Sequence, residues 1–232
     1  MELSKRLNAV AGLVTEGASV ADIGTDHGYI PIYLIEHGIS SKVIAMDINQ
    51  GPLERAREHI REVGLEDQIE TRLSDGMEAL RAGEVDGIIT AGMGGGLVIK
   101  ILTDYPKITE SLKYCILQPQ SEIHKVREFL NKQGYKIIEE DMVKEDGKYY
   151  PMMKVRMEHG EPEDYQKIDY LYGKRLLEKK HPVLYEYLQR DYRIKSEIQD
   201  NLKGQQNERI KQRIKDLEEE LILIREAMRM FE

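Results

Sequence analysis

The stretch Val20-Ala21-Asp22-Ile23-Gly24-Thr25-Asp26-His27-Gly28-Tyr29-Ile30-Pro31 decides the fold of this chain. It predicts a buried strand over 19–24, a tight glycine turn, and a helix from about Gly28 to His37 that Gly38 ends. Glycine permits a strained turn and close approach of a ligand, and the start of a helix offers unsatisfied N–H groups. The pattern is typical of a nucleotide-like ligand at the top of a parallel sheet.

The composition is that of an ordinary globular protein. The chain has 232 residues, of which 33% are charged and 41% hydrophobic, enough for one α/β domain and an appendage. Its single cysteine, Cys115, excludes an internal disulfide and fits a reducing compartment. The N-terminus lacks the apolar core of a signal peptide, and no apolar run is long enough to span a membrane. We therefore expect a cytoplasmic protein that does not bind or span a membrane.

Five β/α units are predicted around the opening stretch, and an amphipathic helix over 3–16, capped by Ser4, precedes them. The strands are expected at 19–24, 42–47, 69–73, 85–90 and 114–117, and the helices at about 28–37, 52–63, 77–82, 97–102 and 121–133. Two more strand-like runs, 135–144 and 148–158, flank Asp146-Gly147, which is a hairpin signal. An all-parallel dinucleotide-binding sheet would not end in a hairpin. We predict the Rossmann-like class I methyltransferase fold, an α/β sheet of seven mostly parallel strands with the last one antiparallel.

The chain changes character from Pro162, where charged residues and tyrosines replace the strand signals. Two helical runs, 163–180 and 183–203, are expected on either side of Pro182, and Gly204 begins the last turn. Apolar residues of the final helix step by four and three, as in a heptad seam: Ile210, Ile214, Leu217, Leu221, Ile224, Met228 and Phe231. We favour a coiled-coil helical hairpin in a monomer, because 183–203 carries a partner stripe. A dimer through the heptads is the alternative. The expected domains are 1–160, which binds the cofactor and carries the catalysis, and 161–232.

Three acidic residues are expected at the ends of successive strands. The spacing Asp22-x-Gly24-x-x-x-Gly28 is not that of the dinucleotide fingerprint. Asp47 ends the second strand, where a carboxylate can accept both hydroxyls of a ribose, and Asp75 ends the third, where it can accept the amino group of adenine. Alone, each acid is as readily a turn or capping residue. Together, at one edge of a sheet, they predict a site for S-adenosyl-L-methionine. The residues expected to bind it are Asp22, Gly24, Thr25, His27, Gly28, Asp47, Ile48, Asp75, Gly76, Gly92 and Met93.

Four motifs carry a family resemblance. They are Lys5-Arg6-Leu7, the stretch 22–31, Gly92-Met93-Gly94-Gly95 and Leu117-Gln118-Pro119-Gln120. With them the whole chain resembles the bacterial tRNA (adenine(22)-N1)-methyltransferase family. The resemblance implies a Rossmann-like domain with a coiled-coil appendage, and methylation of N1 of the adenine at position 22, in the D-arm of tRNA. The chain departs from the wider methyltransferase superfamily at Asp26, where a glycine is usual, and lacks the Asp/Asn-Pro-Pro-aromatic tetrad of amino-methylating enzymes.

The implied reaction needs alignment more than proton transfer. Adenine N1 carries a lone pair and no proton, so the enzyme must expose it, align it with the sulfonium methyl and exclude water. The target base must leave its stack, and the product base is cationic. Asp26 is the candidate for offsetting that charge, with a helix cap as its alternative role. The predicted catalytic residues are Asp26, His27 and Tyr29, although His27 and Tyr29 could equally be structural.

Further residues are predicted to contact the substrate: Lys5, Arg6, Gln118, Pro119 and Gln120. The Gln118 amide can pair with an adenine edge, but each of these residues could instead be an ordinary solvated or strand-end polar group. The glycine run 92–96 is expected as a loop against which the base could lie, and a phosphate loop is not expected because no Gly-Lys-Ser/Thr follows. The histidines and the cysteine lack ligand spacing, so we expect no metal.

Basic residues and tyrosines alternate in the appendage, which suits RNA contact as well as it suits a solvated hairpin with tyrosines in its core. The net charge of −8 argues against a nucleic-acid partner. The argument is weak, because phosphate binding needs only a local basic patch. Two other functions stay open at this point. One is methyl transfer to a small molecule or a protein, and the other is a non-enzymatic coiled-coil interaction module.

Overall fold

The computed structural model describes residues 2–203 and 207–232. The chain divides into two compact units, Met1–Glu163 and Asp164–Glu232. Among the described residues, no helix combines the length and the apolar character needed to cross a membrane.

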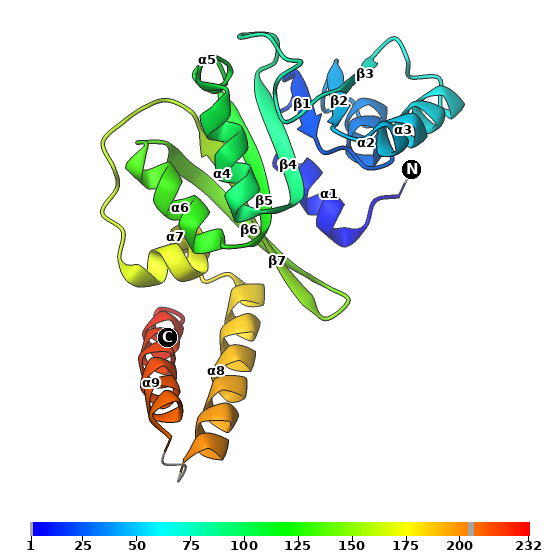
Figure 1. Cartoon of the computed structure of the whole chain (residues 1–232). Coiled ribbons are helices and arrows are strands. Elements are labelled where there is room, and N and C mark those ends of the chain that lie inside the picture. The colour runs from blue at the N-terminus through cyan, green and yellow to red at the C-terminus, as the bar shows by residue number, and fades with distance from the viewer. Residues whose placement is uncertain (1, 204–206) are drawn as a thin grey trace. The chain divides into compact units, whose positions relative to one another are not determined.

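The first unit is built on one sheet (Figure 1). Within the described residues its strands are β1 (Val20–Ile23), β2 (Val43–Asp47), β3 (Ile69–Leu73), β4 (Gly87–Gly94), β5 (Tyr114–Ser121), β6 (Lys136–Glu145) and β7 (Lys148–Arg156), in the order β3-β2-β1-β4-β5-β7-β6. Strand β7 pairs antiparallel with β5 and β6, whereas β1 to β5 pair parallel with one another. The predicted methyltransferase topology is confirmed. The strand order reverses between β1 and β4, the point at which open α/β sheets bind ligands.

Helices cover both faces of the sheet (Figure 1). They are α1 (Lys5–Gly12), α2 (Tyr29–Glu36) and α3 (Gln50–Glu62) on one face, and α4 (Gly95–Asp104), α5 (Pro106–Thr109) and α6 (Ile123–Lys132) on the other. Successive side chains of a strand point to opposite faces. In β2, Val43 and Ala45 therefore join the core under the first group, and Ile44 and Met46 join the core under the second.

Two local signals read from the sequence hold in the structure. The hydroxyl of Ser4 accepts a hydrogen bond from the backbone N–H of Leu7 at 3.3 Å and so caps α1. Asp146 and Gly147 have φ values of 49° and 73°, as a type I′ turn between β6 and β7 requires. The predicted hairpin is confirmed.

The short helix predicted over 77–82 is wrong, because the described segment is a series of turns. The hydroxyl of Ser74 accepts from the N–H of Ala79 at 3.0 Å and donates to the carbonyl of Gly76 at 3.1 Å. These bonds give the backbone an alternative to a helical ladder. Met77 and Leu80 still reach the core.

The loop predicted over 92–96 is also wrong, because β4 continues to Gly94 and α4 begins at Gly95. The extra length comes from β5, which likewise continues to Ser121 and pairs with β4 there. The register shifts twice between Ala91 and Gly94, so the paired strands are irregular at this end. Gln118, Pro119 and Gln120 therefore lie within a strand.

The second unit is helical. It contains a π-helical turn η1 (Asp169–Gly173), α7 (Lys174–Glu178), α8 (Pro182–Leu202) and α9 (Glu208–Arg229). A helix was predicted over 163–180, but helical structure begins only at 167. The N–H of Gln166, just before this start, donates to the Asp169 carboxylate at 2.8 Å.

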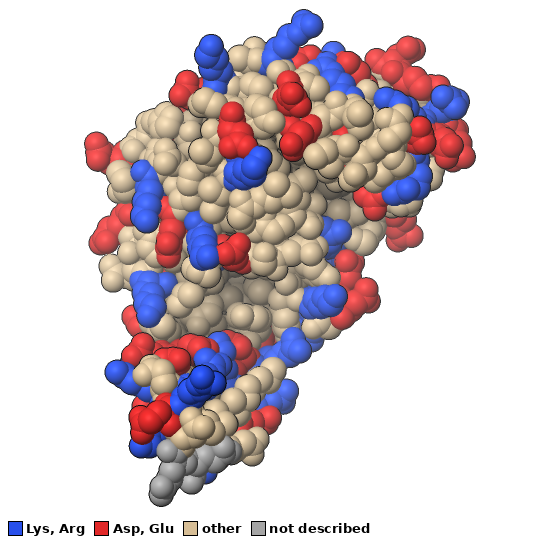
Figure 2. Space-filling model, in the orientation of Figure 1, with Lys and Arg blue, Asp and Glu red and all other residues tan. Residues whose placement is uncertain are grey.

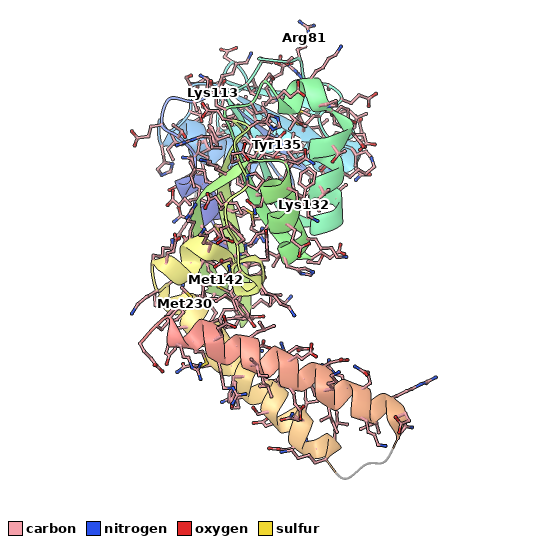
Figure 3. The ribbon with its side chains drawn as sticks, turned by 90° about the vertical axis from the view of Figure 1, so that its left-hand side faces the viewer. Arg81, Lys113, Lys132, Tyr135, Met142 and Met230 are labelled. Atoms are coloured by element: carbon pink, nitrogen blue, oxygen red, sulfur yellow. The ribbon has the colours of Figure 1, made fainter. Side chains whose placement is uncertain are left out.

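Helices α8 and α9 run side by side in opposite directions (Figures 1 and 3). The Tyr185 ring lies 5.0 Å from that of Phe231, and Lys195 is 3.0 Å from Glu220, which defines the antiparallel pairing. The buried residues of the hairpin are Leu184, Leu188, Leu217, Leu221, Ile224 and Ala227. The predicted helical hairpin is confirmed. Gly204, expected at its turn, lies outside the described residues.

Candidate active site

A cavity of about 200 Å³ opens at the carboxyl ends of β1 and β4, where the strand order reverses. Its lining residues are Arg6, Leu7, Asp22, Gly24, Asp26, Tyr29, Ile30 and Ala91. A more open cavity of about 570 Å³ lies along the α8–α9 hairpin and contains none of the residues predicted for the site. The smaller cavity is therefore the candidate site.

Two glycines of the turn after β1 are required by their surroundings. Gly24 has φ +76°, and a Cβ there would collide with the terminal methyl of Met93. Gly28, which precedes α2, has φ +69°, and a Cβ there would lie 3.3 Å from the Cβ of Ala56 on α3. The backbone N–H groups of Gly24 and Thr25 both donate to the carbonyl of Met46 at 2.8 Å. The turn is thus fastened to β2, and neither glycine has room for a side chain.

Asp22 is a buried carboxyl group in the wall of the cavity, with 4% of its surface exposed. Burial raises the pKa of Asp22 from 3.8 to about 6; the Thr25 hydroxyl beside it lowers the pKa, and the charge of Asp47 raises it further. A cationic ligand group placed beside Asp22 would favour its ionised form.

The other two strand-end acids lie at the next two strands of the same edge. Asp47 Oδ1 accepts a hydrogen bond from the N–H of Asn49 at 2.7 Å, and the Asp47 carbonyl accepts from the N–H of Ser74 at 2.9 Å. The Asp75 carbonyl accepts a hydrogen bond from the Tyr105 hydroxyl at 2.7 Å. This edge therefore offers two carboxylates whose side chains are not buried.

Small and apolar groups flank these acids. Ile48 follows Asp47 and is 59% exposed. Gly76 has φ +55°, and a Cβ there would lie 3.1 Å from the Tyr105 ring and 3.3 Å from Ile101. An exposed aliphatic side chain and a bare backbone beside a carboxylate suit the face and edge of a planar base.

The three predicted catalytic residues lie together next to the cavity. The Asp26 carboxylate is 3.2 Å from Arg55 and 3.3 Å from Nε2 of His27. The ring of His27 stacks on that of Tyr29 with centroids 5.2 Å apart, and on that of His59 at 5.5 Å. These side chains form one polar and aromatic cluster on α2, α3 and the turn before α2.

A second cluster joins residues far apart in the sequence. Nη1 of Arg6 donates to Oε1 of Gln118 at 2.8 Å, and the N–H of Gly92 donates to the same oxygen at 3.1 Å. The Arg6 guanidinium lies 5.6 Å from the centroid of the Tyr150 ring. Gln118 is fully buried and Pro119 is buried, whereas Lys5 and Gln120 are exposed and Met93 is half-buried. The sequence predicted that Gln118 contacts an adenine. This geometry instead favours a role in which Gln118 holds the Arg6 side chain in place.

Several residues of the site escaped prediction. Leu7, Ile30 and Ala91 line the cavity. The others contact predicted site residues: Arg55, His59, Tyr105 and Tyr150. Arg55 and His59 are four apart on one helix after Asp47, so they share a face, but the spacing does not show that this face meets the turn after β1. The tyrosine contacts arise from tertiary placement and had no local signal. Among the described residues, no group of three or more His, Cys, Asp or Glu side chains could hold a metal ion.

Comparisons with known proteins agree on one family. A family model described as a methyltransferase domain matches residues 3–153. The tRNA (adenine(22)-N(1))-methyltransferase of Bacillus subtilis (strain 168) is 39% identical over 153 residues, covering 66% of this chain. That alignment spans 64% of the length of the B. subtilis enzyme, a little less than two thirds.

Solved structures match over nearly the whole chain. The crystal structure of the B. subtilis m1A22 tRNA methyltransferase TrmK has a TM-score of 0.85 at 32% identity and covers 98% of this chain and 99% of that one. The structure of M. capricolum TrmK, in complex with the cofactor product S-adenosyl-homocysteine, has a TM-score of 0.85 at 27% identity and covers 100% of both chains. The likeness therefore includes the helical second unit.

Proposed function

The chain belongs to the TrmK-like family of tRNA m1A22 methyltransferases, and from this premise we propose that it methylates N1 of the adenine at position 22 of tRNA. The observation that carries the proposal in the structure is the cavity beside Gly24, which Asp22, Asp26 and Arg6 line at the switch point of the sheet.

The residues around the cavity fit S-adenosyl-L-methionine, which supplies a methyl group on a positively charged sulfur when it is bound. Asp22 offers a carboxylate to the cationic part of this cofactor, and Gly24 presents bare backbone to the same cavity. Asp47 offers oxygens to the ribose hydroxyls. Asp75, with Gly76 and Ile48 beside it, suits the adenine of the cofactor.

The target adenine approaches from the side of Asp26, His27 and Tyr29. Its N1 is a nucleophile without prior loss of a proton, so these residues orient the base and exclude water. Methyl transfer leaves the positive charge on the base, and the Asp26 carboxylate offsets it. Arg6, held by Gln118 and Tyr150, borders the same cavity and contacts the RNA.

The tRNA is held in part by the second unit, whose exposed basic residues include Lys179, Lys180, Arg190 and Arg193. We propose a monomer, because the hairpin buries Leu217, Leu221 and Ile224 of the heptad seam within one chain. We also propose the cytoplasm as its location, a reducing compartment in which the buried, free Cys115 stays unpaired.

One experiment tests the proposal. Purified protein is incubated with methyl-labelled S-adenosyl-L-methionine and two tRNA transcripts that differ only in having adenosine or guanosine at position 22. The methylated nucleosides are then mapped. A mock preparation from host cells that do not express this protein controls for host enzymes. We expect N1-methyladenosine at position 22 in the first transcript and no label in the second. Label that ignores position 22, or that enters a protein or small molecule instead, contradicts the proposal.

A further inference from the structure

One face of α3 contacts the turn that follows β1. Nη2 of Arg55 lies 3.2 Å from Oδ1 of Asp26, and Nδ1 of His59 lies 2.9 Å from the backbone oxygen of His27. Residues four apart lie on the same side of a helix, so both contacts come from one face. A carbonyl oxygen can only accept, which means that Nδ1 of His59 carries the hydrogen. Helix α3 thus binds two successive residues of the turn through separate polar groups.

His27 has a backbone conformation that needs such support. Its φ is +62°, in the left-handed region that residues with a side chain seldom adopt unless the surroundings enforce it. The His27 ring is nearly parallel to the rings of Tyr29 and His59, with interplanar angles of 7° and 19°. Its Nε2 lies 3.3 Å from Asp26 Oδ1. The backbone oxygen and the ring of His27 are therefore both held by neighbouring groups.

Asp26 needs support for a different reason, because its side chain is 67% exposed. An exposed carboxylate rotates readily, and each fixed orientation costs side-chain entropy. Arg55 has two opposing effects on it: it restricts the orientation of the carboxylate, and it neutralises part of the charge. Between exposed groups the charge effect is small, since water screens it. Orientation therefore dominates.

We infer that Arg55 and His59 are positioning residues, which hold Asp26 and His27 in place for the transfer step. The inference rests on the proposed function, because it assigns Asp26 and His27 to the reacting base. It adds a second task to α3, which packs on β2 and β3 and also sets the geometry of the turn after β1.

The test measures kcat, KM for tRNA and the Kd of S-adenosyl-homocysteine for the full-length protein and its variants. Arg55→Ala and His59→Ala should each lower kcat about tenfold and leave cofactor affinity within about twofold, because misplaced groups impair transfer more than binding. Arg55→Lys and His59→Asn should restore most of the rate, since the Lys ammonium can still donate to the Asp26 carboxylate and the Asn amide can replace the Nδ1 donor. Arg61→Ala, at an exposed position of the same helix, is the matched control and should behave as the wild type.

A double-mutant cycle separates positioning from simple loss of structure. If Arg55 acts through Asp26, Arg55→Ala should lower kcat no further in a protein that already carries Asp26→Ala. Additive losses, a parallel fall in cofactor affinity and melting temperature, or a faster Arg55→Ala variant would overturn the inference. If the wild-type protein methylates position 22 and Arg55→Ala and His59→Ala have the same kcat as the wild type, the inference is overturned and the proposed function stands. A wild-type protein that methylates no tRNA would overturn both.

Discussion

Asp47 is the residue whose role in cofactor binding is simplest to measure. Replacing it with alanine removes a charged acceptor that we assign to the ribose hydroxyls, and should weaken binding by about 1–3 kcal/mol. Asp47→Asn keeps one acceptor oxygen and should lose less. Isothermal titration with S-adenosyl-homocysteine gives the affinities, and Asp67→Ala, an exposed acid before β3, is the control. Equal affinity for Asp47→Ala and the wild type would remove the ribose assignment.

The raised pKa of Asp22 predicts how the free energy of unfolding depends on pH. Burial raises its pKa from 3.8 to about 6, so the folded chain holds the proton more tightly than the unfolded chain does. The stabilisation from the protonated carboxyl is complete below about pH 4 and is lost as the pH rises through about 6, a change of about 3 kcal/mol in the free energy of unfolding.

Asp22→Asn cannot ionise and should lack this loss. Urea denaturation of the cofactor-free protein between pH 4 and pH 7 should therefore show a smaller decline in unfolding free energy for Asp22→Asn than for the wild type. Asp67→Asn, which changes an exposed acid, should follow the wild-type curve. Parallel curves for the wild type and Asp22→Asn would mean that Asp22 titrates as in the unfolded chain.

At the same scale, the sequence predicted which acids lie at one edge of the sheet and did not predict what holds the turn. Asp22 and Asp47 follow short apolar runs, and Asp75 follows the strand-like run 69–73, so their position at strand ends could be read locally. Arg55 and His59 are ordinary polar residues of an amphipathic helix. Their contacts with Asp26 and His27 depend on where α3 packs, which no local pattern determines.

Among the structural elements, α4 begins at a glycine that lies close against its neighbours. A Cβ at Gly95 would lie 2.5 Å from the carbonyl oxygen of Ser121 and 3.0 Å from Cγ2 of Val126. Gly95→Ala should therefore push α4 away from β5 and α6 and destabilise the fold by about 1–3 kcal/mol.

The chain offers a matched control in Gly12, which is also helical and has no atom within 4 Å of its would-be Cβ. Gly12→Ala should stabilise the protein by about 0.5–1 kcal/mol, because alanine loses less conformational entropy in a helix. Chemical denaturation measures both variants. A Gly95→Ala protein as stable as the wild type would show that this approach of α4 to β5 can relax freely.

Elements were predictable wherever the deciding signal was local. The Asp146-Gly147 turn and the strand-like runs on either side of it lie within one stretch of chain, and the hairpin followed from them. The end of β4 could not be read in this way, because its last residues are strand only through their pairing with β5. The apolar spacing of 77–82 favours a helix. The hydroxyl of Ser74 accepts from the N–H of Ala79, and this bond favours turns over the helix.

For the molecule as a whole, charge is distributed rather than concentrated. Basic and acidic side chains are interspersed over the face shown in Figure 2. A chain with net charge −8 can still bind RNA if its cations meet phosphates at a few places. The second unit provides such places in Lys180 and Arg193, which are both exposed.

The last prediction concerns this second unit. Deleting residues 164–232 should lower tRNA affinity about tenfold or more, which corresponds to at least about 1.4 kcal/mol, and leave cofactor affinity unchanged. Fluorescence anisotropy with labelled tRNA measures the first, and titration with S-adenosyl-homocysteine measures the second and shows that the remaining unit is folded. In the full chain, Lys180→Glu combined with Arg193→Glu should weaken tRNA binding and reduce its salt dependence, since phosphate contacts release counterions. If tRNA affinity survives both changes, the first unit binds the RNA alone, and the helical hairpin has another purpose.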